Sequence, residues 1–426
     1  MDKKNVHFMG VGGSGCSAAF ALARHSGFEV SGCDLEKTSP YLDKKLTKLV
    51  QTGHSSSHLV GVDLLVYSPA IPLLDQANKE LTSAQEKGIR TMPWEKFLAE
   101  YIIPGKFLIA VSGAHGKGTT TAMIAAILEK ANFDPTCLVG AKVSSWGRNY
   151  RLGGSKYFVL EADEYKERFL VYRPDFAVIT NIDYDHPDYF KNIESVKSAF
   201  SKFVNNLKPG SVLVNGPDVD LKNPNGQTKK LEVVENFDLK LPGNYNKLNA
   251  SLAAIVARSL NIKEKIIKET LESFPGLARR FEFKGEEKGV LVFDDYAVHP
   301  KEISETLKAT REKFPDRIIW LVFQPHTFSR LKVFFGDFVS VFEDSPVDKI
   351  LLVDIFAARE RNDGTISSSD LVKKIKKKEV RYISSLDETA AYIAKYTSAG
   401  NVIMTMGAGD IYKLPDMILK KLSNKS

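Results

Sequence analysis

A glycine-rich loop between an apolar run and a helix-forming segment constrains this chain more than any other stretch. Residues 107–111 are apolar and predict a buried strand, and residues 122–128 predict a helix. Between them stands Gly113-Ala-His-Gly-Lys-Gly-Thr-Thr120. The backbone N–H groups of such a loop, together with the positive end of the following helix, can hold phosphate oxygens. The order of strand, loop and helix therefore predicts a phosphate-binding site.

The side chains of this loop indicate a nucleotide and a metal ion. Lys117 supplies positive charge for the terminal phosphates, and the hydroxyls of Thr119 and Thr120 can hold Mg²⁺. The spacing departs from G-x-x-x-x-G-K-[ST], because Gly118 separates the lysine from the first threonine. An ordinary strand-to-helix turn is the alternative, but such a turn needs neither the lysine nor the threonines. We expect the nucleotide to contact Gly113, His115, Gly116, Lys117, Gly118, Thr119 and Thr120.

Composition and charge narrow the class of protein. A length of 426 residues predicts two or three domains of roughly 100–200 residues each. The net charge of +7 suits small anionic ligands, and the dispersed lysines form no nucleic-acid-binding stripe. Cys16, Cys33 and Cys137 have neither metal-ligand spacing nor a paired pattern, which favours a reducing compartment. Without a signal peptide or an apolar run near about 18 residues, we expect a cytoplasmic protein with no membrane insertion.

A second glycine loop opens the chain. The pattern Gly10-x-Gly12-Gly13-x-Gly15 lies between a predicted strand and a helix starting near Cys16, and a second strand ends at Asp34. This is the layout of a dinucleotide-binding fold, in which glycines let the backbone approach a pyrophosphate. An NAD-linked oxidoreductase is one interpretation, and tight packing without a ligand is another. The pattern stops near residue 104, so we expect one small domain that holds one pyrophosphate ligand.

Polar clusters follow two predicted strands of the middle region. Residues 157–160 lead to Glu161, and residues 177–180 precede a run that contains His186. Ligands gather beyond the carboxyl ends of parallel strands, and carboxylates suit Mg²⁺, so Glu161 and His186 are candidate metal ligands. A solvated helix start and a core histidine are the alternatives. Further along, Asn246 and Asn249 are one helical turn apart and are candidates for adenine recognition or for helix capping.

The last third of the chain predicts another parallel sheet. Apolar runs at 290–293, 318–323, 350–353 and 401–404 alternate with helical segments, and polar residues follow each run. We therefore predict the α/β fold class, with three consecutive α/β domains and a composite active site. These are a Rossmann-like domain at 1–104, a P-loop ATPase-like central domain at 105–276 and a Rossmann-like domain at 277–426.

Taken in series, these motifs resemble the Mur ligase family of ATP-dependent enzymes that build the peptidoglycan precursor. Gly10-Val-Gly-Gly-Ser-Gly15 is similar to the family's uridine-diphosphate loop, and Gly113-Ala-His-Gly-Lys117 to its ATP loop. The runs at 161–164, 180–186 and 246–249 are similar to its central-domain motifs. Arg279-Arg-Phe281, Asp294-Asp-Tyr296 and the runs at 323–330, 354–360 and 407–411 resemble the C-terminal domain of the alanine-adding branch.

The resemblance implies an enzyme, an activity and a set of site residues. It implies addition of L-alanine to UDP-N-acetylmuramate through an acyl phosphate, with ATP and Mg²⁺, by a monomer or weak dimer. Lys117, His186 and Arg280 would be catalytic, and Thr119, Glu161 and His186 would hold the metal. Asn246 and Asn249 would hold adenine, with Asp295 on the ribose. The sugar nucleotide would contact Gly12, Gly13, Ser14, Asp34, His54 and Ser68, and the amino acid Tyr296, His299, His326 and Arg330.

Three departures from the family pattern leave alternatives open. Gly118 replaces the usual hydroxyl residue after the loop lysine, and Ala297-Val298 stands where the branch usually has Gly-His. Glu164-Tyr165 and the run at 172–174 are closer to a murein-tripeptide recycling ligase that acts on the same UDP-sugar. A Mur-like nucleotide-binding scaffold without turnover is the alternative of another class.

Overall fold

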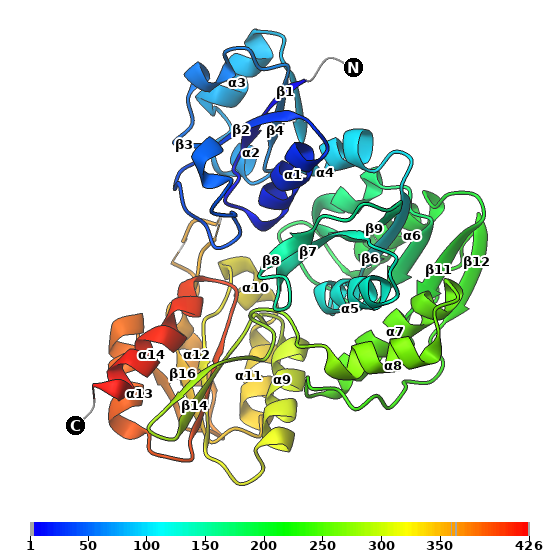
Figure 1. The fold of residues 1–426 in the computed structure, drawn as a ribbon. Coiled ribbons are helices and arrows are strands. Elements are labelled where there is room, and N and C mark those ends of the chain that lie inside the picture. Colours follow the sequence, from blue (N-terminus) through cyan, green and yellow to red (C-terminus); the bar gives the residue numbers. More distant parts are fainter. Residues whose placement is uncertain (1–3, 359, 363, 425–426) are drawn as a thin grey trace. The chain divides into compact units, whose positions relative to one another are not determined.

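The computed structural model describes residues 4–358, 360–362 and 364–424, and these residues form three β-sheets with helices on them (Figure 1). The predicted fold class of three α/β domains is confirmed. Arg359, inside the run at 354–360, lies outside the described residues. The domain limits at 104/105 and 276/277 stay predictions.

The described chain divides into two compact units, and the division does not follow the three sheets one to one. The first unit holds the first two sheets and comprises Met1–Asp183, Val196–Phe237 and Leu248–Pro275. The second unit holds the third sheet and comprises Tyr184–Ser195, Asp238–Lys247 and Gly276–Ser426. Two short pieces that we expected in the central domain, one of them containing His186, therefore pack with the C-terminal sheet.

The first sheet is parallel and runs in the order β3-β2-β1-β4-β5. Met9, Cys33 and Leu65 of its strands belong to one buried cluster. Gly15, in the first turn of α1, lies so close to Trp94 that a Cβ would overlap the indole ring. Its strands are β1 (Asn5–Met9), β2 (Glu29–Asp34), β3 (Val50–Thr52), β4 (Leu64–Tyr67) and β5 (Arg90–Pro93). Its helical segments are α1 (Ser14–His25), η1 (Thr47–Leu49), η2 (Ser56–Leu59), α2 (Ile71–Leu74), α3 (Lys79–Glu86), α4 (Trp94–Phe97) and η3 (Leu98–Ile102).

The second sheet has the phosphate-loop strand at its centre, in the order β12-β11-β10-β6-β9-β7-β8. The described strands pair in parallel, apart from the antiparallel pair β7 and β8. They are β6 (Phe107–Ser112), β7 (Thr136–Val143), β8 (Arg148–Arg151), β9 (Tyr157–Glu161), β10 (Phe176–Ile179), β11 (Ser211–Asn215) and β12 (Gly226–Lys230). The helical segments of this region are α5 (Lys117–Lys130), η4 (Tyr165–Val171), α6 (Ile193–Asn205), α7 (Asn244–Ser259) and α8 (Glu264–Ser273).

The predicted start of the helix after the phosphate loop is wrong. The sequence predicted a helix from residue 122, but α5 begins at Lys117. Gly116, with φ +81°, is its N-cap, so the loop ends earlier than expected. Gly118 is tolerated because a glycine in the first turn lowers helix stability less than a glycine in the helix interior.

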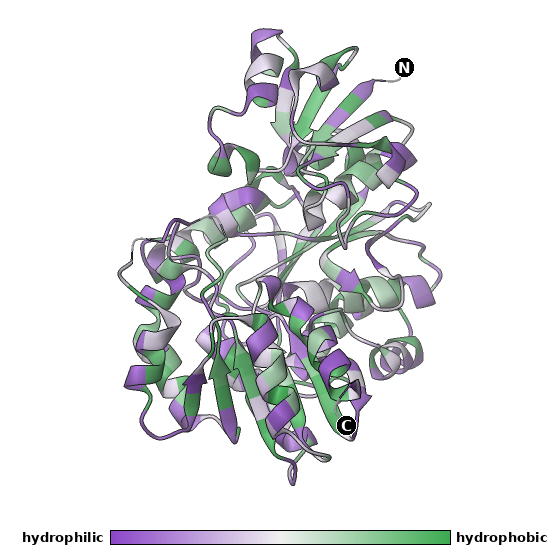
Figure 2. Ribbon diagram, turned by 90° about the vertical axis from the view of Figure 1, so that its left-hand side faces the viewer, coloured by the Kyte–Doolittle hydropathy of each residue, from purple (hydrophilic) through white to green (hydrophobic). Residues whose placement is uncertain are grey.

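The third sheet runs β13-β14-β18-β15-β16-β17, with β13 antiparallel to β14 and the other described pairs parallel. Along β15, Leu321 and Phe323 pack on one face, whereas Trp320 and Val322 pack on the other, as the two-residue period of a strand requires. Figure 2 shows hydrophobic residues concentrated in strands of this kind, with polar residues on the helices that cover them. The runs predicted at 290–293, 318–323, 350–353 and 401–404 are confirmed as strands.

The elements of this third region have the following bounds. Its strands are β13 (Glu282–Glu287), β14 (Val290–Asp295), β15 (Ile319–Phe323), β16 (Lys349–Leu352), β17 (Val380–Tyr382) and β18 (Val402–Met406). Its helices are α9 (Pro300–Lys313), α10 (Phe328–Val333), α11 (Phe335–Asp344), α12 (Ser368–Lys374), α13 (Leu386–Tyr396), η5 (Asp410–Lys413) and α14 (Leu414–Ser423). Within the part of the chain that the structure describes, no helix combines the length and the apolar character needed to cross a bilayer.

Candidate active site

The phosphate loop joins β6 to α5, as the sequence predicted, and two of its glycines cannot be replaced without strain. Gly113 has φ +139° and Gly116 has φ +81°, in the region that L-residues avoid. A Cβ on Gly113 would overlap the hydroxyl of Thr180, and one on Gly116 would overlap the side-chain oxygen of Asn249. The loop is therefore packed closely from both sides at the N-terminus of a 14-residue helix.

Lys117 is held inside the loop by an ion pair that the sequence did not predict. Its Nζ lies 2.9–3.0 Å from the carboxylate oxygens of Glu164 and donates to the carbonyl of Gly113 at 2.7 Å. Burial lowers the pKa of Lys117, but Glu164, Asp163 and Glu161 raise it by more, so the pKa lies above its ordinary value. The ammonium charge is thus already in place for a phosphate.

The three threonines of α5 differ in what their hydroxyls do. Thr120 Oγ1 donates to Asn249 Oδ1 at 3.2 Å, and Thr121 Oγ1 donates to the carbonyl of Lys117 at 2.8 Å. Within the described part of the chain, the buried Thr119 makes no side-chain hydrogen bond. Thr119 is therefore the hydroxyl left for a ligand.

Residues after β10 fix the other side of the loop. Asn181 Oδ1 accepts from the backbone N–H of His115 at 2.9 Å, while Thr180 Oγ1 donates to the carbonyl of His115 at 2.6 Å. His115 Nε2 lies 3.5 Å from Asp183 Oδ2. Sequence reasoning missed Thr180 and Asn181 as loop-positioning residues. Their place directly after the strand that pairs with β6 was the available clue.

Two of the candidate metal ligands, Glu161 and His186, belong to different units. Glu161 ends β9 and pairs in register with Val111 of β6, so the end of β9 lies beside the strand that leads into the phosphate loop. Its carboxylate is close enough to raise the pKa of Lys117. Its Oε2 accepts from the N–H of Gly140 at 2.6 Å. His186 belongs to the second unit, with φ +55° and its Nε2 3.9 Å from Asp185 Oδ2.

Both adenine candidates lie on α7 and are buried. The side-chain oxygen of Asn249 accepts from Thr120 and packs on Gly116, so this residue positions the phosphate loop. Asn246 Nδ2 donates to the carbonyl of Pro242 at 2.8 Å. Recognition of adenine by this pair stays a prediction.

The predicted sugar-nucleotide residues are only partly brought together. Asp34 Oδ2 accepts from the N–H of Gly12 at 2.7 Å, which ties the end of β2 to the first glycine loop. Ser14, after Gly13, begins α1, and its carbonyl accepts from Asn149 Nδ2 at 2.7 Å. Ser68 lies against this loop, because a Cβ on Gly10 would stand 2.8 Å from its Cβ. His54 instead contacts Cys33, with Nδ1 3.2 Å from Sγ.

Two arginines and two aspartates meet at the end of β14. Arg279 Nε donates to Asp294 Oδ2 at 2.8 Å, and its guanidinium also donates to the carbonyl of Gly407. The Asp295 carboxylate accepts from the N–H groups of residues 281 and 297 at 2.8 and 2.9 Å. Burial raises the pKa of Asp295 to about 6, although Arg280 opposes the rise. The Arg280 guanidinium lies over the half-exposed ring of Tyr296, 5.4 Å from its centre.

Arg330 and His326 form one constellation with Asp185. Arg330 Nε and a terminal nitrogen donate to Asp185 Oδ1 at 3.1 and 2.9 Å, and its other terminal nitrogen lies 2.9 Å from His326 Nδ1. Burial raises the pKa of Asp185, but Arg330 and the neighbouring histidines lower it by more, so it stays well below its ordinary value. His299 is the N-cap of α9, where its Nδ1 accepts from the N–H of Lys301 at 3.3 Å.

Comparison with known proteins identifies the family. The family models described as Mur ligase family, catalytic domain, as Mur ligase middle domain and as Mur ligase, glutamate ligase domain match residues 5–104, 111–235 and 279–409. The chain belongs to the Mur ligase family.

Similar proteins are named for one reaction within the family. UDP-N-acetylmuramate–L-alanine ligase of Clostridium tetani is 40% identical over 98% of both chains. The protein of the same name from Acetivibrio thermocellus is 39% identical over 98% of this chain and 96% of that one. Among solved structures, UDP-N-acetylmuramate-alanine ligase of Thermotoga maritima matches with a TM-score of 0.82 and 25% identity, over 99% of this chain and 100% of that one.

Proposed function

We propose that this chain is an ATP-dependent ligase that joins L-alanine to UDP-N-acetylmuramate during synthesis of the peptidoglycan precursor. One observation carries the assignment: relatives named for this reaction are 39–40% identical and span almost the whole chain. The phosphate loop with its charged lysine supplies the part that ATP chemistry requires. Consumption of ATP and a UDP-sugar, together with three unpaired buried cysteines, supports a cytoplasmic enzyme. We propose a monomer or weak dimer.

The reaction needs activation because a carboxylate is a poor acyl donor. ATP transfers its γ-phosphoryl group to the muramoyl carboxylate, the alanine amine attacks the acyl phosphate, and phosphate leaves. Positioning and electrostatics dominate such phosphoryl transfers. Lys117, already charged within the loop, and the positive end of α5 would neutralise the transferring group. Arg280 is the further cation that we assign to this step.

The residues of the loop fit a magnesium ion. Mg²⁺ prefers hard oxygen ligands and a few protein contacts. The Thr119 hydroxyl, which has no hydrogen bond among the described residues, and the Glu161 carboxylate, which acts on Lys117, supply such oxygens. His186 is the third ligand that we propose. When bound, the ion would neutralise phosphate charge.

The remaining contacts are also proposals. We assign the sugar nucleotide to Gly12, Gly13, Ser14, Asp34, His54 and Ser68, and adenosine to Asn246, Asn249 and Asp295. Tyr296, His299, His326 and Arg330 would orient the amino acid. The carboxylate of alanine would share Arg330 with Asp185, which holds the guanidinium in one orientation.

Phosphate release by the purified full chain tests the function. The reaction contains ATP, Mg²⁺, UDP-N-acetylmuramate and one acceptor: L-alanine, glycine, L-serine or tripeptide. We expect L-alanine to support the fastest release. Release with tripeptide alone would instead indicate a recycling ligase, and no release with any acceptor a nucleotide-binding scaffold. Lys117→Ala should abolish release, whereas Lys130→Ala, at the other end of α5, should not.

A further inference from the structure

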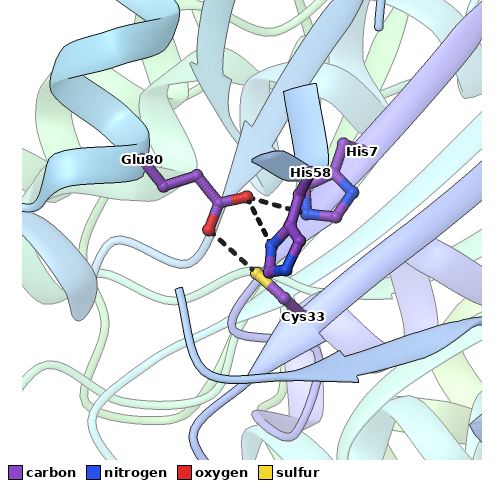
Figure 3. Close-up of side chains that lie close together, drawn as sticks. All are labelled: His7, Cys33, His58 and Glu80. Carbon is purple, nitrogen blue, oxygen red and sulfur yellow. Dashed lines mark hydrogen bonds and ion pairs between the residues drawn. The ribbon is translucent and has the colours of Figure 1, made fainter. Parts of the chain in front are cut away.

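Among the described residues, four side chains of metal-binding type meet within the first sheet, outside the phosphate loop. They are His7 of β1, Cys33 of β2, His58 of η2 and Glu80 of α3 (Figure 3). One donor atom from each lies within 4.8 Å of all the others. His7, Cys33 and Glu80 are fully buried, and the side chain of His58 is only 6% exposed. A group of donors from four different elements thus forms inside the domain. His54 Nδ1 lies beside it, 3.2 Å from Cys33 Sγ and 3.6 Å from Glu80 Oε2.

The Glu80 carboxylate is the centre of this cluster. Its Oε1 lies 3.0 Å from His7 Nε2 and 3.1 Å from His58 Nδ1. Its Oε2 accepts from Cys33 Sγ at 3.3 Å and from the N–H of Ser55 at 3.0 Å. A buried carboxylate needs compensating positive charge, because isolated charge is costly in a low-dielectric interior.

The hydrogen bond on the far side of His7 can orient its inner nitrogen as a ligand. Nδ1 lies 2.8 Å from Ser31 Oγ. When Nδ1–H donates to Ser31, the Nε2 lone pair points into the cluster. Nε2 is 3.0 Å from Glu80 Oε1 but outside hydrogen-bonding geometry with any described group. In that tautomer Nε2 and Oε1 are both acceptors, and a cation between them would satisfy both. An outer hydrogen bond of this kind typically orients a metal-ligating histidine.

We propose that His7, Cys33, His58 and Glu80 form a structural zinc site. Two imidazole nitrogens, one thiolate and one carboxylate are a tetrahedral donor set for Zn²⁺. Zn–N and Zn–S bonds of about 2.0–2.3 Å place neighbouring donors about 3.3–3.6 Å apart. The Glu80 oxygens lie 3.0–3.3 Å from the donor atoms of His7, His58 and Cys33, close to that separation.

Charge balance also favours a divalent ion here. A thiolate at Cys33 and a carboxylate at Glu80 together cancel the charge of Zn²⁺, which leaves a neutral group in a buried place. Four protein ligands complete the tetrahedron, so the site has a structural and not a catalytic character. The ion would join η2 and α3 to the central strand β1 and its neighbour β2.

Cobalt substitution tests the site on the full chain. After metal removal with a chelator, the protein is titrated with Co²⁺ and its absorption spectrum is recorded. We expect a thiolate-to-cobalt charge-transfer band that saturates at one equivalent and disappears when Zn²⁺ is added. The magnesium ligands that we propose include no thiol, so they cannot produce this band. Absence of the band in the wild-type protein would overturn the proposal, whatever the ligase activity.

Two substitutions with matched controls identify the ligands. Cys33→Ser should abolish the band, whereas Cys16→Ser, at a buried cysteine of the neighbouring helix α1, should keep it. His58→Gln should weaken cobalt binding at least tenfold, and His25→Gln, at an exposed histidine, should not. Zinc should raise the Tm of the wild type and not that of Cys33→Ser. A charge-transfer band that survives in Cys33→Ser would contradict the assignment of the thiolate ligand. If a variant fails to fold, the presence or absence of the band in the wild-type protein still tests the metal site.

Discussion

Replacing each threonine at the start of α5 by valine should separate metal binding from loop packing. The exchange keeps the branched shape and removes the hydroxyl. Thr119 makes no side-chain hydrogen bond among the described residues, so Thr119→Val breaks no such bond. We therefore expect its free energy of unfolding to change by less than about 1 kcal/mol.

The neighbouring positions should behave differently. Thr120→Val removes the donor to Asn249 Oδ1 and leaves a buried acceptor unpaired, at a cost of about 1–3 kcal/mol. Thr121→Val loses its bond to the carbonyl of Lys117, which is worth about 0.5–1.5 kcal/mol. Neither change removes the hydroxyl that we assign to magnesium.

The Mg²⁺ dependence of phosphate release is the discriminating assay, run beside urea unfolding. Thr119→Val should raise the half-saturating Mg²⁺ concentration by roughly 10- to 100-fold, the scale on which altered metal environments act. Thr119→Ser is the control that should keep the wild-type requirement. An unchanged requirement in Thr119→Val, or a shifted one in Thr120→Val, would refute the assignment of the metal-binding hydroxyl.

Three further predictions follow from strained or buried groups. Gly116→Ala and Gly105→Ala both force alanine to φ near +80°, which should lower the free energy of unfolding by about 1–2 kcal/mol. Of the two, only Gly116 has a neighbour that a Cβ would contact. Only Gly116→Ala should therefore also raise the KM for ATP, by tenfold or more. Burial raises the pKa of Glu95 from 4.5 to about 7, so the native state binds this proton more tightly than the unfolded state. The free energy of unfolding should therefore fall by about 3 kcal/mol as pH rises from 4.5 to 7. Urea unfolding of Glu95→Gln over the same pH range should lack that fall. Arg330→Met removes the arginine partner of the buried Asp185 carboxylate and should cost about 3–5 kcal/mol in urea unfolding. Adding Asp185→Asn should recover part of this loss, and full stability of Arg330→Met would contradict the ion pair.

The sequence predicted the interior strands well because both faces of those strands are buried. The runs at 107–111 and 318–323 are continuously apolar, as strands covered by helices on both sides must be. Edge strands carry no such pattern. In β12 the residues are mostly polar and exposed, and β17 is short and mixed, so pairing with a neighbour and not composition makes them strands.

The site could be predicted only where one contiguous motif contains it. The phosphate loop is such a motif, and its place between β6 and α5 follows from the order of elements. The pairing of Lys117 with Glu164 depends on which strands are neighbours, and no spacing reveals it. The capping role of His299 was likewise not visible in any motif, because it depends on where α9 begins. The cluster around Glu80 was invisible for this reason as well, since its donors come from four elements that only the fold brings together.

The central claim is that this chain makes an amide bond through an acyl phosphate on the sugar nucleotide. UDP-N-acetylmuramate labelled with ¹⁸O in its carboxylate tests this most directly, in a reaction with ATP, Mg²⁺ and L-alanine. We predict that each released phosphate carries an oxygen from the carboxylate, in step with formation of the alanyl amide, and that Lys117→Ala releases none. Unlabelled phosphate, or labelled phosphate without the amide, would contradict the account.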